Sequence, residues 1–163
     1  MRILTLLLAL SYFSANAQKA YLKFIDPEIP GNLKEGNFTN YFELSSVKYN
    51  MSKINNKAST GVMEVVLENS VESPNIWSNF LNTDKPIKFE IVFTSLPPER
   101  IFLSYKLDRA YINAMNLGSE NLTHVSIWIG AFAYKYFEYN QSGQLIGTKS
   151  VGWDFLDNVI KTF

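Results

Sequence analysis

The sequence predicts a mainly β protein: a small β-barrel or sandwich of about seven antiparallel strands with one flanking α-helix. Three observations support this prediction. Apolar and polar residues alternate at period two through most of the chain, as is typical of half-buried strands. Phe, Tyr, Val and Ile dominate these runs, and helical spacing of apolar residues occurs in one short segment. With 163 residues, 47% of them hydrophobic, the chain can bury one substantial core.

The N-terminus follows a different pattern. Arg2 gives a short positive start, residues 3–13 are an apolar run too short to span a bilayer, and Ala15-Asn16-Ala17 fits a small-residue cleavage site. These are the three parts of a secretory signal peptide. The sequence therefore predicts residues 1–17 as a signal peptide and residues 18–163 as a single domain, secreted or periplasmic, in a bacterium. The alternative is a misassigned start codon.

Three strands precede the helix. In the second strand the apolar face changes near Ser45 and Ser46, which indicates a β-bulge. In the third, Glu64 and Glu68 are expected to point outward. The predicted elements in order are strand 20–25, loop 26–40, strand 41–51, exposed polar loop 52–60 and strand 61–68.

The helix is predicted from capping and spacing. Ser73 followed by Pro74 is a helix start, and apolar residues at positions 76, 77, 80 and 81 fall on one helical face. Pro86 ends the run after about ten residues.

Four strands follow, at residues 87–93, 101–115, 122–139 and 145–151. The second changes face at Asp108 and Arg109, a second candidate bulge. The third is apolar on both faces, which indicates a partner subunit on one of them, or else an ordinary interior strand covered twice. One face is expected to carry Val125, Ile127, Ile129, Ala131 and Ala133, and the other Trp128, Phe132, Tyr134 and Tyr136.

The chain has a long aromatic strand, a turn at residues 141–144, a return strand and a closing Gly152-Trp153-Asp154. This order of motifs resembles the Hcp family, the haemolysin-coregulated proteins that form the tube of the type VI secretion system. The likeness extends from Tyr21 to about Asn158 and includes the helix and the strand after it. The predicted signal peptide and the Asn-rich loops depart from the family pattern, so a divergent exported relative is the alternative to a true tube subunit. The residues that match the family signature are Gly130, Phe132, Gly152, Trp153 and Asp154.

The resemblance implies a non-enzymatic subunit without a cofactor. Such a subunit forms hexameric rings, and the rings stack into a tube that carries effectors. The implied partners are other copies of the chain, secretion-system components and effector proteins. By its place in the chain, the polar loop is the candidate ring-stacking contact, with Lys53, Asn55, Asn56 and Lys57.

The residues themselves offer no convergent catalytic set. His124 is the only histidine, and the sequence interpretation favours a hydrogen-bonded structural residue over a general base. Glu64 and Glu68 would be about 13 Å apart along a strand, too wide for a glycosidase pair. Asp154 could serve a sugar site, but a hydrogen bond to the backbone that holds the C-terminal turn is favoured. Cysteine is absent, so no cysteine metal site is expected.

Charge gives no reason to expect nucleic acid or a membrane as partner, because 15 basic residues balance 15 acidic ones. The alternative function is an exported β-sandwich binding module for a carbohydrate or protein ligand. Its stacking platforms would be Trp128, Tyr134, Tyr136 and Tyr139.

Overall fold

The computed structural model describes residues 18–34, 36–54, 57–58, 61–82, 85–95, 99–118 and 120–161. The predicted signal peptide lies outside these residues. The seven predicted strands and the predicted helix are all present, so the mainly β prediction is confirmed; three short strands add to them. The elements are β1 (Lys19–Asp26), β2 (Phe42–Asn50), β3 (Lys53–Ile54), β4 (Lys57–Ala58), β5 (Gly61–Glu68), α2 (Ser73–Asn82), β6 (Ile87–Ser95), β7 (Arg100–Leu117), β8 (Leu122–Tyr139), β9 (Leu145–Asp154) and β10 (Val159–Ile160).

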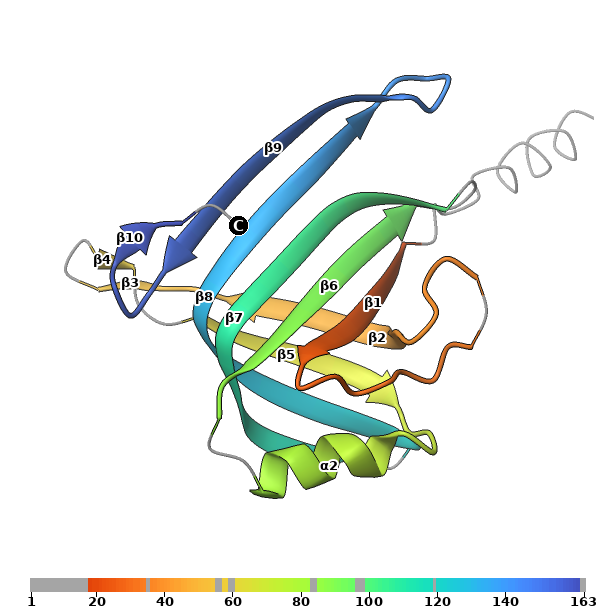
Figure 1. Cartoon of the computed structure of the whole chain (residues 1–163), viewed down its shortest axis with the longest axis vertical. Coiled ribbons are helices and arrows are strands. Elements are labelled where there is room, and N and C mark those ends of the chain that lie inside the picture. The colour runs from red at the N-terminus through yellow and green to blue at the C-terminus, as the bar shows by residue number, and fades with distance from the viewer. Residues whose placement is uncertain are drawn as a thin grey trace, which may run out of the picture.

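The long strands close into an antiparallel barrel. The hydrogen-bonded order is β8-β5-β2-β1-β6-β7, and the pairing of β7 with β8 completes the circle. β9 and β10 continue the sheet outside this circle, because β9 pairs with β8 and β10 pairs with β9 (Figure 1). The barrel therefore owes its closure to the long β7–β8 ribbon.

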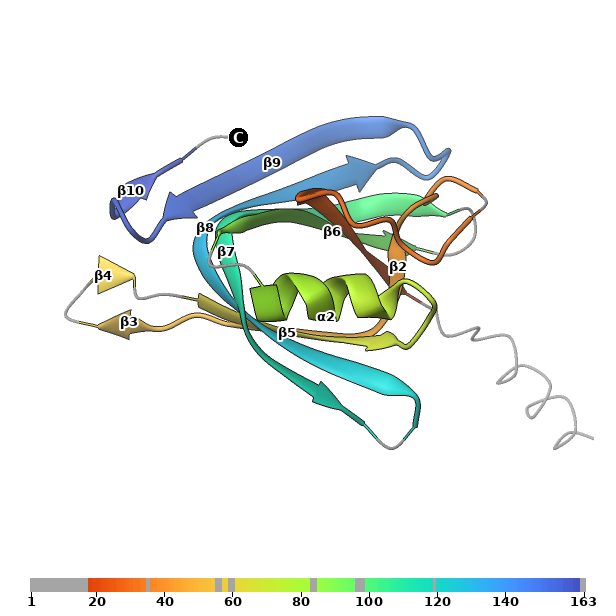
Figure 2. The same cartoon turned by 60° about the horizontal axis from the view of Figure 1, so that its bottom comes forward.

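The helix α2 lies across one open end of the barrel (Figures 1 and 2). Ile76 is 1% exposed and belongs to the main core, with Trp77 and Phe80 packed against it. The Ser73 hydroxyl accepts a hydrogen bond from the backbone N–H of Ser70 at 2.8 Å, which ties the first turn of the helix to the chain before it. No helix in the described part of the chain is both long and apolar enough to span a membrane.

Both predicted bulges are confirmed. The register of β2 against β5 shifts between Leu44 and Ser46. The register of β7 against β6 shifts between Leu107 and Ala110 of β7, and Arg109, which lies between them, has a positive φ of 50°. The Asp108 carboxylate accepts the backbone N–H of Arg109 at 2.8 Å, so a side chain of the bulge satisfies this donor. Each bulge lets its strand turn a corner of the barrel.

The expectation of two separate apolar faces on β8 is wrong. Ile129 points into the core, and after Gly130 the core face passes to Phe132. A Cβ atom at Gly130 would lie 2.5 Å from the carbonyl oxygen of Arg109, so the two bends, in β7 and β8, pack directly against each other. Figure 1 shows β7 and β8 as neighbouring strands that both bend along their length. The apolar residues on both sides of β8 are thus largely explained by a bent strand inside one subunit.

A second, smaller core lies outside the barrel wall. Tyr21 on β1 and Val92 on β6 are covered by Phe38 from the loop between β1 and β2. The rings of Tyr21 and Phe38 stack with their centroids 4.3 Å apart. This predicted loop is therefore packed on the sheet at Phe38, and it shields part of the outer face of β1 and β6.

Candidate functional site

The structure brings the five family-signature residues together on β8 and β9. Phe132 pairs with Trp153, and the neighbouring pairs place Gly152 and Asp154 beside the bend at Gly130. The Phe132 ring contacts Tyr49 inside the barrel, with centroids 5.8 Å apart, and burial raises the pKa of the Tyr49 hydroxyl. The signature residues thus form one structural centre.

Asp154 is the hub of this centre. Its carboxylate is 1% exposed and accepts the backbone N–H groups of Leu156 and Asp157, each at 3.1 Å. It also pairs with the guanidinium of Arg109 and with the Lys161 ammonium at 3.2 Å. The predicted backbone hydrogen bond of Asp154 is therefore present. A carboxylate with this many partners holds the C-terminal turn and has little capacity left for a sugar.

Gly152 allows the backbone at Lys161 to pack directly against β9. Lys161 donates its backbone N–H to the Gly152 carbonyl at 3.1 Å, and its own carbonyl lies where a Cβ of Gly152 would be. The sequence interpretation placed Arg109 at a bulge but did not predict that Arg109 and Lys161 contact Asp154, because both come close to it only in the folded chain.

The candidate ring-stacking loop is a short hairpin rather than an irregular loop. Lys53 pairs with Ala58 and Ile54 pairs with Lys57, and this hairpin projects away from the barrel in both views (Figures 1 and 2). Asn55 and Asn56, like the side chains of the two lysines, lie outside the described residues.

Exposed apolar side chains lie in two parts of the structure that the sequence interpretation did not single out. We call the first the β9–β10 edge: its members lie on or after the outermost long strand. They are Leu145, Ile146, Val151, Leu156, Val159 and Ile160, exposed by 49% to 73%. The second, the α2 patch, combines Leu81 and Leu117, exposed by 71% and 68%, with the adjacent Trp77 and Pro74.

The four aromatic residues of the alternative, stacking interpretation do not form one exposed platform. Tyr134 packs against Tyr105 at the main core with ring centroids 5.3 Å apart, and the Tyr139 hydroxyl donates to the Ile101 carbonyl at 2.9 Å. Trp128 is half-buried, and Tyr136 is exposed.

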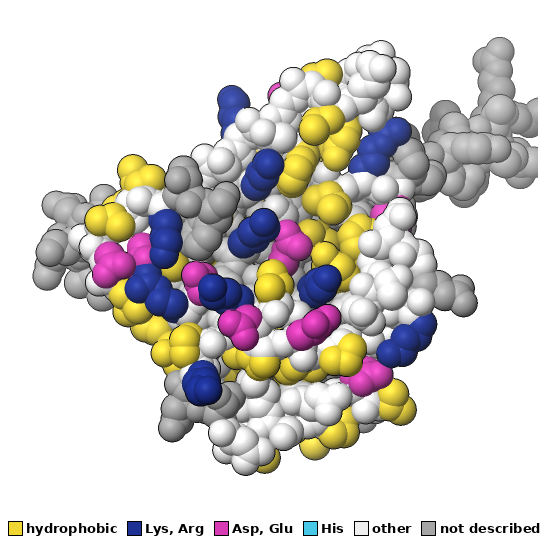
Figure 3. All heavy atoms as spheres, viewed as in Figure 1, with side chains coloured by type: hydrophobic (Ala, Val, Ile, Leu, Met, Phe, Trp, Pro, Cys, Tyr) yellow, Lys and Arg dark blue, Asp and Glu magenta, His cyan; other side chains and the backbone are white. Residues whose placement is uncertain are grey.

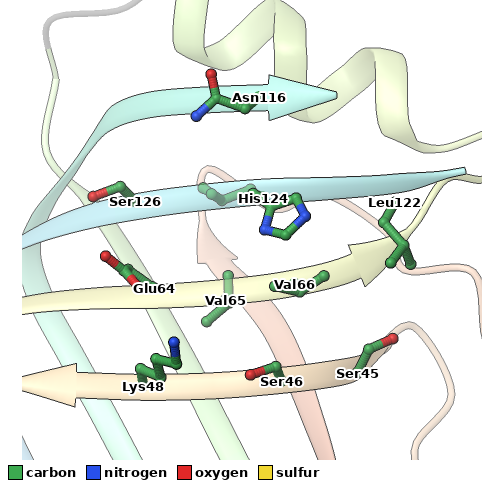
Figure 4. A pocket seen from close by; sticks show the side chains of 11 residues that line it. Ser45, Ser46, Lys48, Glu64, Val65, Val66, Asn116, Leu122, His124 and Ser126 are labelled. Atoms are coloured by element: carbon green, nitrogen blue, oxygen red, sulfur yellow. The ribbon is translucent and has the colours of Figure 1, made fainter. Parts of the chain in front are cut away.

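Glu64 and His124 line a hollow of about 540 Å³ on the outer face of β2, β5, β7 and β8, which we call the His124 hollow. Glu68 is exposed and lies outside its lining. Cross-strand pairing places Lys48, Glu64 and Ser126 in one row, and Figure 4 shows them side by side. The His124 imidazole is exposed beside Val66, and no described residue forms a hydrogen bond with it. The hydrogen-bonded structural role expected for His124 is therefore not seen. The described residues hold no group of three His, Cys, Asp or Glu side chains suited to a metal ion.

Solved structures share this architecture. A protein described as a type six secretion system protein superimposes with a TM-score of 0.75 at 16% identity, over 89% of this chain and 100% of its own. Hcp1 from Salmonella typhimurium gives a TM-score of 0.72 at 18% identity, over 89% and 99%. The chain has the Hcp fold.

A further Hcp-like structure is described as a type VI secretion system effector from Yersinia pestis, with a TM-score of 0.65 at 18% identity over 83% of this chain and 98% of that one. No family model matches the sequence, and no curated protein matches it significantly. At these identities the likeness establishes the fold, and the resemblance inferred from the sequence motifs is confirmed at that level.

Proposed function

We propose that the protein is an exported, non-enzymatic structural subunit of a type VI secretion system, forming hexameric rings that stack and carry effector proteins. The observation that carries the proposal is the Hcp fold, shared over 100% and 98% of the length of two proteins whose descriptions name that system. The predicted signal peptide supports export. The signature residues support a structural role, because Asp154 is fully engaged in holding the C-terminal turn.

The exposed apolar surface supports ring formation. A closed ring uses two different patches on each subunit, each covering the other on the next copy. The β9–β10 edge and the α2 patch are two such patches, on the outermost strand and at the open end of the barrel respectively (Figure 1). An outer strand with exposed apolar residues is also a surface that folded proteins usually cover.

Ring stacking would use the β3–β4 hairpin. It projects from the barrel, and its residues Lys53, Asn55, Asn56 and Lys57 are polar, as suits a contact between rings that also exist separately.

The first experiment is the mass of residues 18–163 by size-exclusion chromatography with light scattering at micromolar concentration. Six times the monomer mass is expected. Ile146→Glu in the β9–β10 edge and Leu81→Glu in the α2 patch should each reduce the assembly to smaller species, because each buries a charge in an apolar contact. Ile25→Glu, on an exposed residue outside both patches, is the control. A monomeric parent protein would refute the ring proposal.

A second candidate function is the exported binding module, which the His124 hollow favours. Trp128 lies one outward position along β8 from Ser126, so its fluorescence should report a ligand there. Titration with soluble polysaccharides tests this function. An unchanged emission spectrum across the set would remove it.

A further inference from the structure

A smaller hollow lies on the outer face of β7, β8 and β9, on the opposite side of the sheet from the main core. Its volume is about 200 Å³. Among the described residues it is lined by three lysines and by no acidic residue. We call it the lysine hollow, and its lining consists of Ser104, Lys106, Ala133, Lys135, Ser150, Val151, Gly152, Ile160 and Lys161.

Two cross-strand rows build this hollow. One row pairs Ser104 with Lys135 and Lys135 with Ser150; the next pairs Lys106 with Ala133 and Ala133 with Gly152. Period-two alternation turns all of these side chains to the same face. Because Ala133 and Gly152 are small, the space beside the lysines stays open, and the segment at Lys161 that crosses Gly152 forms a wall.

The local charge is positive in a chain whose basic and acidic residues balance. Lys106 and Lys135 are exposed, and neither has an ion-pair partner among the described residues. Lys161 contacts Asp154 and also lines the hollow. The nearest acid in the row, Glu90 on β6, lies opposite Lys106 and accepts a hydrogen bond from the Tyr41 hydroxyl at 3.3 Å. Figure 3 shows basic side chains over β7, β8 and β9 on the face turned to the viewer.

Ser104 adds a hydroxyl group to the lining of the hollow. The residue is only 5% exposed, it lines the hollow, and its hydroxyl has no hydrogen-bond partner in the described part of the chain. Its oxygen is not among the buried polar atoms that lack a partner, so the hydroxyl is open to the hollow and available to a bound group. A ligand in the hollow would supply the missing partner.

We propose that the lysine hollow binds a small oxyanion of the phosphate type. The ammonium groups of Lys106 and Lys135 would neutralise its charge, and the hydroxyls of Ser104 and Ser150 would donate hydrogen bonds to its oxygens. The volume is large enough for one such group. The hollow shares Val151 and Ile160 with the β9–β10 edge, but the four residues that would contact the anion belong to neither apolar patch nor to the His124 hollow. The proposal therefore does not depend on the ring proposal.

Isothermal titration calorimetry of residues 18–163 with sodium phosphate, at constant ionic strength, tests the site. Saturable binding with a dissociation constant of about 1 mM or tighter is expected. Lys106→Gln and Lys135→Gln should each weaken it about tenfold, because each removes a charge-assisted contact. Lys135→Arg should retain binding, and Lys48→Gln, in the His124 hollow, is the matched control.

Further titrations identify the source of the anion. Phosphoserine that binds more tightly than inorganic phosphate would indicate a phosphorylated group as the natural ligand, and the reverse would indicate the free ion; both support the proposal. Four results would overturn it. The first three are no saturable binding, equal weakening by Lys48→Gln, and acetate binding as tightly as phosphate. Binding that appears only after residues 162–163 are removed would also overturn the proposal, because those two residues would then be the natural occupant of the hollow.

Discussion

Replacing Asp154 by alanine tests whether the hub beside the bend stabilises the subunit. The substitution leaves the guanidinium of Arg109 and the ammonium of Lys161 without their shared carboxylate, and it removes the acceptor of two backbone N–H groups. Removing one partner of a buried ion pair costs about 3 to 5 kcal/mol. The lower half of this range is expected, because Arg109 and Lys161 are 30% and 37% exposed and can be rehydrated.

The assay is urea unfolding followed by tryptophan fluorescence and by circular dichroism, with both signals required to give one midpoint. Asp157→Ala is the matched control, because Asp157 contacts the same Arg109 at 3.4 Å but is 65% exposed. Such a surface pair contributes about 0 to 1 kcal/mol. If Asp154→Ala costs no more than Asp157→Ala, the carboxylate is not the hub that its contacts describe.

Three further substitutions examine the bend, the loop and the helix. Gly130→Ala should lower the free energy of unfolding by about 1 to 3 kcal/mol, because the added methyl group would meet the β7 backbone. Gly147→Ala should be nearly neutral, because the nearest atom to the added methyl group would be 3.7 Å away. Equal effects of the two substitutions would contradict the close packing of the two bends. Burial and a neighbouring glutamate raise the pKa of Tyr41 from 10.0 to about 12, so the folded state holds the hydroxyl proton more tightly than the unfolded state. The stability that this protonated hydroxyl contributes is complete below pH 10 and is lost as the pH rises through 12. Unfolding midpoints at about pH 9 and pH 11 should therefore fall less in Tyr41→Phe than in the parent, and an identical fall would disprove the assignment. Ile76→Ala should lower the free energy of unfolding by about 2 to 5 kcal/mol, since this side chain anchors α2 in the core. Leu81→Ala, on the exposed side of the helix, should lower it by less than about 0.5 kcal/mol. A neutral Ile76→Ala would show that the helix does not close the barrel.

The sequence was sufficient for the elements that depend on local pattern. Alternation located the seven long strands and helical spacing located α2, because each pattern is complete within about ten residues. The bulges at Ser45-Ser46 and at Asp108-Arg109 were also predictable, since an inserted residue displaces the apolar positions visibly.

The bend of β8 was not predictable in the same way. The pairing of β8 with β7 keeps one register through Gly130, so no inserted residue marks the change of core face from Ile129 to Phe132. Periodicity then assigns the two residues to opposite faces, although the bend brings both to one core. This is why a partner subunit was inferred from β8, while the exposed apolar residues lie on β9, β10 and α2.

The candidate site was predictable as a set of residues but not as an arrangement. Asp154 was identified with a backbone hydrogen bond, yet its ion pair with Arg109 joins two strands that are distant in sequence. Ser104 and Lys135 became a candidate anion site only through the pairing of β7 with β8. No spacing rule in a single sequence contains such cross-strand rows.

β5 and β9 pair with successive parts of β8, and this arrangement determines which strand can separate without opening the barrel. Residues 122–129 of β8 hydrogen-bond to β5, residues 131–139 hydrogen-bond to β9, and the barrel closes without β9. Unzipping β9 therefore breaks one ladder and leaves the closed circle of strands intact, whereas unzipping β5 opens the circle. Backbone amides of β9 that are protected by β8 should exchange with solvent through this partial opening, and those of β5 only when the whole domain unfolds. The barrel would therefore stay folded while β9 unfolds and refolds locally.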